Sequence, residues 1–329
     1  MLATRLEYDA PVIRNFEEML DVVSERPRRT VSVASAEDDQ TLGAIRRAVE
    51  SGIAAAVLTG REVQLTAAAE AVGLDLKSVR CVYTASVDES AVAAVREVSD
   101  GRAHILMKGK LQTNELLKAA LAKEAGLRTG RTLSHVFVQD LALYPRLLFV
   151  TDGGLNIAPD EETLLQITQN AVALARLFVP RPKVAIVSAL EFVYEKMPST
   201  VVARRIQERA PKEIPEADVQ GPLAFDEVVS ELACRRKGVT GPVAGRADVA
   251  VVPNIEMGNA LFKAQIYLAG ARAAGVVVGG KSSIVLASRS DSDETKFLSL
   301  ALGLLACEIR YGAPGEPIEI SEAALALAA

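Results

Sequence analysis

Short apolar runs alternate with amphipathic runs along almost the whole chain, and this alternation limits the possible fold more than any other feature. The runs 30–35 and 183–189 are rich in β-branched and small apolar residues, whereas 38–52, 114–126 and 160–179 space their apolar side chains at three and four, as helices do. Continuous apolar strands separated by helices indicate a mainly parallel sheet covered on both faces. The sequence therefore predicts an α/β protein.

The chain is long enough, at 329 residues, for two ordinary domains, yet no low-complexity linker separates them. We expect two mainly parallel-sheet α/β domains with a cleft between them, one formed by 1–145 plus 296–329 and the other by 146–295. Sites in such sheets lie beyond the carboxyl ends of strands. Segments rich in polar residues follow predicted strands at four such places: MKGK, TDGGLN, PNIEMGN and SRSDSDE.

Composition excludes several classes of partner. The net charge is −5, Trp is absent and no long basic run occurs, which argues against nucleic acid. The three cysteines, Cys81, Cys234 and Cys307, lack the spacing of a disulfide framework or a zinc site. Charged residues interrupt every apolar stretch before it reaches bilayer length, and the first residues carry no signal-peptide core. We therefore expect a cytoplasmic protein without a bound metal.

The segment GVVVGGKS (275–282) fits the pattern of a phosphate-binding P-loop through Gly275, Gly280, Lys281 and Ser282. A P-loop needs a flexible loop before the lysine and a helix that begins at it. Here three β-branched valines precede the glycines, and the strand-like run SSIVLAS follows the lysine. The order strand–turn–strand predicts that the match is accidental, and a long helix over 258–275 is expected before it.

The run SRSDSDE (288–294) brings a hydroxyl, a guanidinium and carboxylates together between a strand end and a helix start. Such a set can orient a phosphate, stabilise an oxyanion and move a proton. The same letters also suit ordinary helix capping, because acidic residues favour the first turn of a helix. The residues alone leave both interpretations open.

Seven segments in order carry a resemblance to a known family: MKGKLQTNELLKAAL, RTGRTLSHVFV, LLFVTDGGLNIAPD, KVAIVSALEFVYEKMPSTVVA, DVQGPLAFDEVVS, AGRADVAVVPNIEMGNALFKAQIYLAGA and LASRSDSDETK. Together they resemble the phosphate acyltransferases, that is phosphate acetyltransferase and, more closely, phosphate butyryltransferase, over about 15–310. The resemblance implies an isopropylmalate-dehydrogenase-like fold, a homodimer or higher homo-oligomer, and transfer of an acyl group between coenzyme A and inorganic phosphate. It implies no metal or organic cofactor.

The resemblance also implies a site. The family's Ser-Arg pair falls on Ser288 and Arg289, and its downstream acid falls on Glu294, or on Asp293 if no residue is deleted here. Arg289 would offset charge on the phosphate and the oxyanion, Ser288 would donate to the same oxygens, and Glu294 would exchange a proton with the CoA sulfur. The expected substrate-binding residues are Lys108, Gly109, Thr113, Arg131, Ser134, Asn259 and Lys263.

Two positions depart from the family pattern. His104 stands where an aspartate is expected, and Lys118 stands on a predicted helix where arginine is more common. A lysine does not reproduce the bidentate contacts that arginine makes to a phosphate. His135 lies among apolar letters and is interpreted as a core histidine with satisfied hydrogen bonds. Asp152, in TDGG, is compatible with turn chemistry or with the site.

Two alternatives remain. A metal- and NAD-dependent decarboxylating dehydrogenase of the same fold would need clustered aspartates, but no second aspartate cluster and no G-x-G-x-x-G fingerprint after a strand occurs. A non-catalytic homologue is disfavoured by the intact Ser-Arg pair and the nearby acid. The acyl chain cannot be deduced from the sequence, because pocket depth depends on side chains from several segments.

Overall fold

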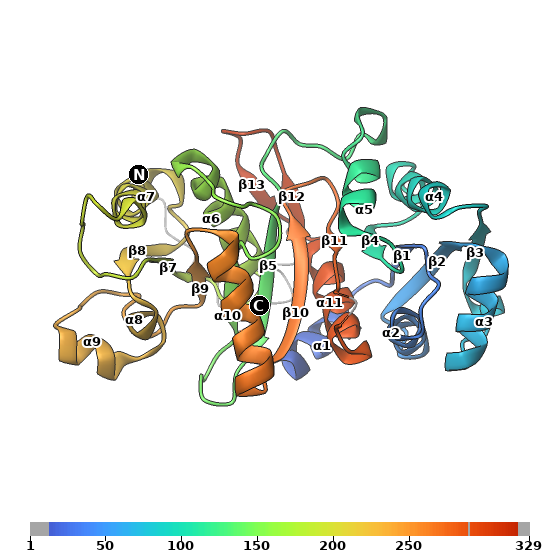
Figure 1. Cartoon of the computed structure of the whole chain (residues 1–329), viewed down its shortest axis with the longest axis horizontal. Coiled ribbons are helices and arrows are strands. Elements are labelled where there is room, and N and C mark those ends of the chain that lie inside the picture. Colours follow the sequence, from blue (N-terminus) through green and yellow to red (C-terminus); the bar gives the residue numbers. More distant parts are fainter. Residues whose placement is uncertain (1–12, 289, 322–329) are drawn as a thin grey trace, which may run out of the picture.

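A single twisted sheet runs through the molecule from end to end, as the computed structural model shows for residues 13–288 and 290–321 (Figure 1). Eleven strands form it within that part of the chain. Their spatial order is β3 (Arg80–Tyr83), β2 (Ala54–Gly60), β1 (Arg29–Ala34), β4 (Ile105–Lys108), β11 (Ile284–Val285), β10 (Arg272–Val278), β5 (Ser134–Asp140), β6 (Leu148–Thr151), β9 (Val249–Val251), β7 (Lys183–Val187) and β8 (Asp218–Leu223). The prediction of an α/β protein with mainly parallel strands is confirmed.

The centre of the sheet is antiparallel, which the sequence pattern did not predict. β10 pairs antiparallel with both β11 and β5, and β5 pairs antiparallel with β6, while the outer pairs on both sides are parallel. As a result β6 and β9 run opposite to β4 and β11. The polar segments after these strands therefore do not meet at one common edge. They approach each other over one face of the central strands.

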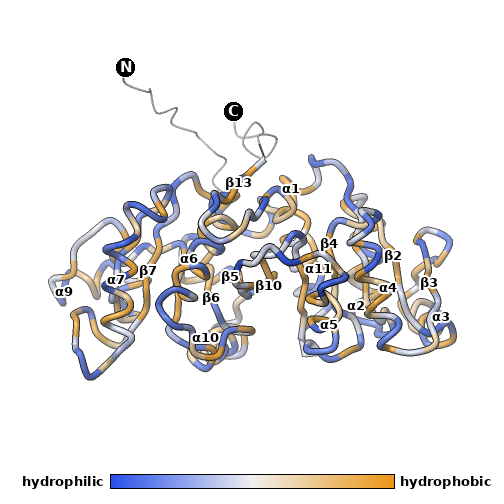
Figure 2. Tube along the Cα trace, turned by 90° about the horizontal axis from the view of Figure 1, so that it is seen from above, coloured by the Kyte–Doolittle hydropathy of each residue, from blue (hydrophilic) through white to orange (hydrophobic). Residues whose placement is uncertain are grey.

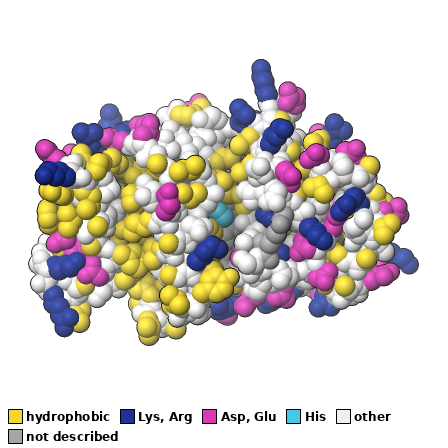
Figure 3. Space-filling model, in the orientation of Figure 1, with side chains coloured by type: hydrophobic (Ala, Val, Ile, Leu, Met, Phe, Trp, Pro, Cys, Tyr) yellow, Lys and Arg dark blue, Asp and Glu magenta, His cyan; other side chains and the backbone are white. Residues whose placement is uncertain are grey.

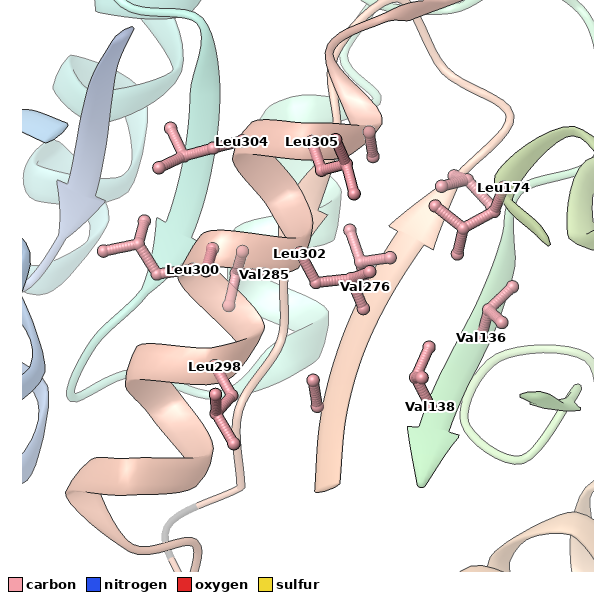
Figure 4. Close-up of a cluster of buried hydrophobic side chains, with 14 of the residues drawn as sticks. Val136, Val138, Leu174, Val276, Val285, Leu298, Leu300, Leu302, Leu304 and Leu305 are labelled. Atoms are coloured by element: carbon pink, nitrogen blue, oxygen red, sulfur yellow. The ribbon is translucent and has the colours of Figure 1, made fainter. Parts of the chain in front are cut away.

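One face of the sheet carries a continuous hydrophobic core. Alternate residues of the central strands, among them Val136, Val138, Val276 and Val285, point into it. Figure 4 shows these side chains packed against leucines of the carboxyl-terminal helix and against Leu174. The helices that contribute to this core are α1 (Phe16–Ser24), α2 (Asp39–Glu50), α3 (Glu62–Val72), α6 (Glu161–Ala175), α7 (Pro198–Glu213) and α11 (Asp293–Ala306).

The opposite face is covered in separate pieces. One hydrophobic cluster lies under α4 (Val87–Ser99) and α5 (Thr113–Ala120). A second includes side chains of α8 (Phe225–Val229) and the start of α10 (Ile255–Ala269), and a third, small one lies under the middle of α10. Figure 2 shows α10 on one side of the molecule and α1 on the other. The breaks between these clusters leave room for a pocket over the central strands.

The remaining elements are short. The 3₁₀ helices η1 (Leu76–Ser78) and η2 (Lys123–Ala125), the helix α9 (Glu231–Lys237), and a separate hairpin of β12 (Ile309–Tyr311) with β13 (Ile318–Ile320) complete the described chain. No helix among the described residues has the length and apolar character needed to cross a bilayer.

Two predicted helices end earlier than the periodicity indicated. The helix expected over 258–275 stops at Ala269, because Gly270 adopts a left-handed conformation with φ 65°. The residues from Arg272 onward then pair with β5 instead. The helix expected over 114–126 likewise ends at Ala120 and is followed by η2.

The strand–turn–strand prediction for the P-loop match is confirmed. β10 ends at Val278, Gly279 turns the chain with φ 98°, and β11 follows without a helix at Lys281. Because no helix begins at Lys281, this loop lacks the helix N-terminus with which a P-loop binds phosphate.

Candidate functional site

A polar pocket of about 360 Å³ lies over the central strands between α5 and α10. Five of the residues expected at the site line it: Lys108, Thr113, Asn259, Lys263 and Ser288. They come from the end of β4, the first turn of α5, one face of α10 and the segment after β11. Residues about 180 positions apart in the sequence are thus brought to one cavity, as the resemblance implied.

The cation Lys108 is nearly buried, with 6% of the residue exposed. Its Nζ donates to the carbonyl oxygens of Gly109 and Leu111 at 3.4 Å each. Gly109 has a steric role, because a Cβ at this position would lie 2.3 Å from the backbone oxygen of Ser35. Only a glycine therefore lets β4 and the chain after β1 approach so closely. This approach fixes Lys108 at the pocket.

The start of α10 is positioned by a similar close approach. Asn254 caps the helix by accepting from the backbone N–H of Met257 at 2.9 Å. A Cβ at Gly258 would lie 2.5 Å from the backbone oxygen of Asp152, so the helix packs directly on the segment after β6. Asn259 donates from Nδ2 to the backbone oxygen of Gly153 at 3.3 Å. These contacts aim Asn259 and Lys263 into the pocket.

Asp291 is the carboxylate that lines this pocket. Its Oδ2 accepts a hydrogen bond from the backbone N–H of Ser288 at 2.7 Å. Burial raises the pKa of Asp291 above its ordinary value, although the positive charges of Lys263, Lys296 and Lys108 oppose the shift. A carboxyl group with a raised pKa can hold and release a proton more readily near neutral pH.

Glu294, expected to be the acid, is placed elsewhere. It receives hydrogen bonds from Arg272 at 3.1 Å and does not line the pocket. Asp293 is the first residue of α11, and its Oδ1 accepts from the backbone N–H of Glu294 at 2.8 Å. Ser292 caps the helix through the backbone N–H of Thr295. The ordinary helix-start interpretation therefore holds for Asp293, and it is Asp291, not Glu294, that lines the pocket.

Arg131 and Ser134 also lie away from the pocket. The guanidinium of Arg131 donates to the backbone oxygens of Gly312 and Glu316 and to Gln169, which ties β5's entry loop to the segment after β12. Ser134 is fully buried on the core side of β5, where its Oγ accepts from Asn170 at 3.1 Å. Both residues serve packing in this structure. Arg289 lies outside the described residues.

The two departures from the family pattern do not line the pocket either. His104 accepts from the backbone N–H of Thr30 at the opposite end of β4, and Lys118 is exposed on α5. Asp152 is nearly buried and accepts from the backbone N–H groups of Gly154 and Leu155 at 2.8 and 2.9 Å. Of its two interpretations, the structure favours turn chemistry.

A second cavity of about 640 Å³ adjoins the first and shares Lys108 and Ser288 with it. Its other walls come from the chain after β1, the start of α2 and the end of β2. Two ion pairs organise it: Arg61 with the buried Glu37 at 2.5 Å, and the buried Lys296 with Asp38 at 3.0 Å.

Among the described residues, no three His, Cys, Asp or Glu side chains group so that they could hold a metal ion.

The floor of the pocket is aromatic, which the sequence analysis missed. His135 and Phe137 on β5 and Phe262 on α10 line it. The sequence signal was present, since alternate residues of the strand face opposite sides, and this strand carries valines on one side but His135, Phe137 and Gln139 on the other. His135 differs from the expected satisfied core histidine, because its Nε2 is buried and has no hydrogen-bond partner among the described residues.

Burial lowers the pKa of His135 from the ordinary 6.5 to about 4, while the charge of Asp152 acts in the opposite direction. Above pH 6.5 the imidazole is neutral in the folded and the unfolded chain. Between pH 6.5 and 4 the unfolded chain binds a proton at this imidazole that the folded chain does not bind. The free energy of unfolding therefore decreases as the pH is lowered through this range. We expect His135→Leu to lose part of this acid sensitivity. Urea unfolding at pH 7, 6, 5 and 4.5 checks it, and an unchanged pH slope in the variant would contradict the assignment.

The fold and the pocket thus define an α/β protein with a cation-rich cavity, a nearby carboxyl group and an apolar floor. The sequence profile of the family described as "Phosphate acetyl/butaryl transferase" matches residues 83–304. Phosphate butyryltransferase of Clostridium acetobutylicum is 40% identical over 296 residues, covering 89% of this chain and 98% of the relative. Phosphate acetyltransferase of Thermotoga maritima is 38% identical over 289 residues, covering 87% and 98%. The chain therefore belongs to the phosphate acetyl/butyryl transferase family.

Solved structures agree with this assignment. A branched-chain phosphotransacylase from Enterococcus faecalis V583 superposes with a TM-score of 0.77 at 34% identity, covering 85% of this chain and 99% of that one. A phosphotransacetylase from Streptococcus pyogenes, at 18% identity, has the same fold with a TM-score of 0.76 over 89% and 99%. The family match and the phosphotransacylase at 34% identity favour an acyltransferase over the dehydrogenase alternative.

Proposed function

We propose that the protein transfers a short acyl group between coenzyme A and inorganic phosphate in the pocket between α5 and α10. The observation that carries this proposal is the grouping of Lys108, Lys263, Asn259 and Ser288 around Asp291, above an apolar floor. Cations and polar donors suit a phosphate, and the floor suits an acyl chain. The family to which the chain belongs supports the same reaction.

The proposed step is direct. An oxygen of HPO₄²⁻ attacks the thioester carbonyl carbon, the new C–O bond forms, and the C–S bond then breaks. The products are the acyl phosphate dianion and the CoA thiol, so the proton of the phosphate ends on sulfur. Lys108 and Ser288 would hold the phosphate and the developing oxyanion together with Arg289, whose assignment rests on the sequence resemblance. Asp291 would carry the proton between phosphate and sulfur.

No metal or organic prosthetic group enters this step, because a phosphate oxygen is itself the nucleophile. We further propose that CoA extends into the adjoining cavity, which shares Lys108 and Ser288 with the reaction pocket. Lys108 and Lys110 in its lining support a ligand that bears phosphates, whereas Arg61 and Lys296 are paired with acidic residues of the same cavity.

We also propose that the halves on either side of the pocket are the two domains of an isopropylmalate-dehydrogenase-like fold, with 1–145 plus 296–329 in one and 146–295 in the other. Lys108 and Thr113 reach the pocket from the first range, and Asn259 and Lys263 from the second, which supports a cleft between them.

We also propose that the protein is cytoplasmic and forms a homo-oligomer. Exposed apolar side chains on α10, among them Tyr267 (67%) and Leu268 (86%), support self-association. Figure 3 shows hydrophobic side chains spread over the left half of this face of the molecule.

The experiment that tests the function is a thiol-release assay. The purified chain is expected to release CoA from butyryl-CoA only when phosphate is present. A parallel reaction with NAD, Mn²⁺ and candidate hydroxy acids tests the dehydrogenase alternative. NADH formation without phosphate-dependent CoA release would reverse the proposal.

A further inference from the structure

The small hydrophobic cluster under the middle of α10 stands apart from the rest of the core. Its buried members are Phe137, Phe262 and Ala273, with Ile266 packed against them. The two phenyl rings stack with centroids 3.7 Å apart and 15° between their planes. Both line the pocket and are 7% exposed. A separate aromatic cluster that opens onto a polar pocket is better suited to contact a ligand than to join the core.

Glycines hold this aromatic row in place from the strand side. A Cβ at Gly153 would lie 2.8 Å from Cε2 of Phe137, and one at Gly275 would lie 3.1 Å from its Cδ1. A Cβ at Gly154 would lie 2.3 Å from Nδ1 of His135. Because the backbone closes on these rings at three points, their positions are fixed. Phe262 comes from α10 instead and completes the row from the opposite side.

The chemical character of this floor is uncharged. His135 contacts Phe137 with ring centroids 4.3 Å apart, and burial keeps its imidazole neutral at physiological pH. Leu286, which is 9% exposed, adds an aliphatic side chain on the β11 side. Of the charged groups of the pocket, Lys108 comes from the end of β4 and Asp291 from the segment after β11, whereas Lys263 follows Phe262 on α10. The pocket is thus divided into a polar part and an apolar part.

We propose that the row of His135, Phe137 and Phe262, with Leu286, is the acyl-chain subsite, and that Phe262 limits the length of chain it takes. This inference rests on the proposed function and names its substrate class: uncharged aliphatic acyl groups larger than acetyl, straight or branched. A charged acyl group such as succinyl is excluded, because its carboxylate would lose its hydration against these rings. Longer chains are excluded because Phe262 closes the subsite.

The test compares kcat/KM for acetyl-, butyryl-, hexanoyl- and succinyl-CoA in the wild type and in Phe262→Ala. The wild type is expected to prefer butyryl-CoA. In Phe262→Ala the hexanoyl-to-butyryl ratio is expected to rise at least about tenfold, since single methylene groups in apolar pockets change selectivity by roughly 10–200-fold. Leu286→Phe, which narrows the subsite, is expected to raise the acetyl-to-butyryl ratio by a similar factor. Phe192→Ala is the matched control, because it removes a phenyl ring that is 53% exposed and does not line the pocket, and it should leave both ratios unchanged.

Truncation of a buried phenyl ring also lowers stability, so Phe262→Leu provides a second variant with a smaller expected shift in the same direction. An active wild type whose acyl profile is unchanged in folded Phe262→Leu and Leu286→Phe would overturn the subsite but leave the reaction standing. Efficient turnover of succinyl-CoA would overturn it as well. A wild type that releases no CoA from any of the four thioesters would overturn the proposed function itself.

Discussion

Asp291→Asn is expected to lower kcat by about 10²–10³, because positioned proton transfer contributes roughly 10²–10⁴ to rate. Asparagine keeps the shape of the side chain and can still accept from the backbone N–H of Ser288, which Asp291 does at 2.7 Å. It cannot carry a proton between phosphate and sulfur. The KM for CoA should therefore change little while kcat falls in both directions, and circular dichroism should match that of the wild type.

Asp293→Asn and Glu294→Gln are the matched controls for this variant, since both are acids of the same segment. Asp293 binds a backbone N–H at the start of α11, and Glu294 pairs with Arg272, so neither side chain lines the pocket. Both controls should retain most of the activity. An inactive, folded Glu294→Gln beside a near-normal Asp291→Asn would restore the acid that the sequence resemblance implied.

Arg289→Ala is expected to have an effect of comparable size, a loss of about 2.7–4 kcal/mol of transition-state stabilisation or roughly 10²–10³ in kcat. The expectation rests on its place in the sequence directly after Ser288, which lines both cavities. Arg289→Lys should recover only part of the loss, because an ammonium lacks the planar fork that binds two phosphate oxygens. Steady-state kcat and KM for phosphate measure both effects.

Arg236, an exposed residue of α9, offers a control for the removal of positive charge. Arg236→Ala should leave kcat and the KM for phosphate unchanged. A folded Arg289→Ala variant with near-normal kcat would show that the Ser-Arg pair is not the reacting centre.

The alternation of strands and helices could be predicted from the sequence because it depends on local periodicity. The antiparallel centre could not, since the direction in which β5, β6 and β10 pair is decided by contacts between residues far apart in the chain. The predicted end of the helix over 258–275 is wrong for a related reason. Its apolar periodicity continues past Gly270, but pairing with β5 decides the conformation of the residues that follow.

The candidate site was predictable as a set of segments more than as a set of side chains. Lys108 ends β4, Asn259 lies near the start of α10 and Ser288 follows β11, and all three line the pocket. Whether Asp291 or Glu294 faces the pocket depends on the direction in which each side chain leaves a short turn. The sequence SRSDSDE does not determine this direction. The prediction that His135 is a core histidine with satisfied hydrogen bonds is wrong. Whether a buried nitrogen finds a partner depends on residues that are distant in the sequence.

In the proposed reaction the pocket passes an acyl group directly from CoA to phosphate without a metal or cofactor. The most direct measurement follows CoA and butyryl phosphate together, in a reaction of the purified chain with butyryl-CoA and phosphate in excess EDTA. We predict that the two products appear in equal amounts and at the same rate as without EDTA. Release of CoA without butyryl phosphate, or loss of turnover in EDTA that a divalent metal restores, would contradict the claim.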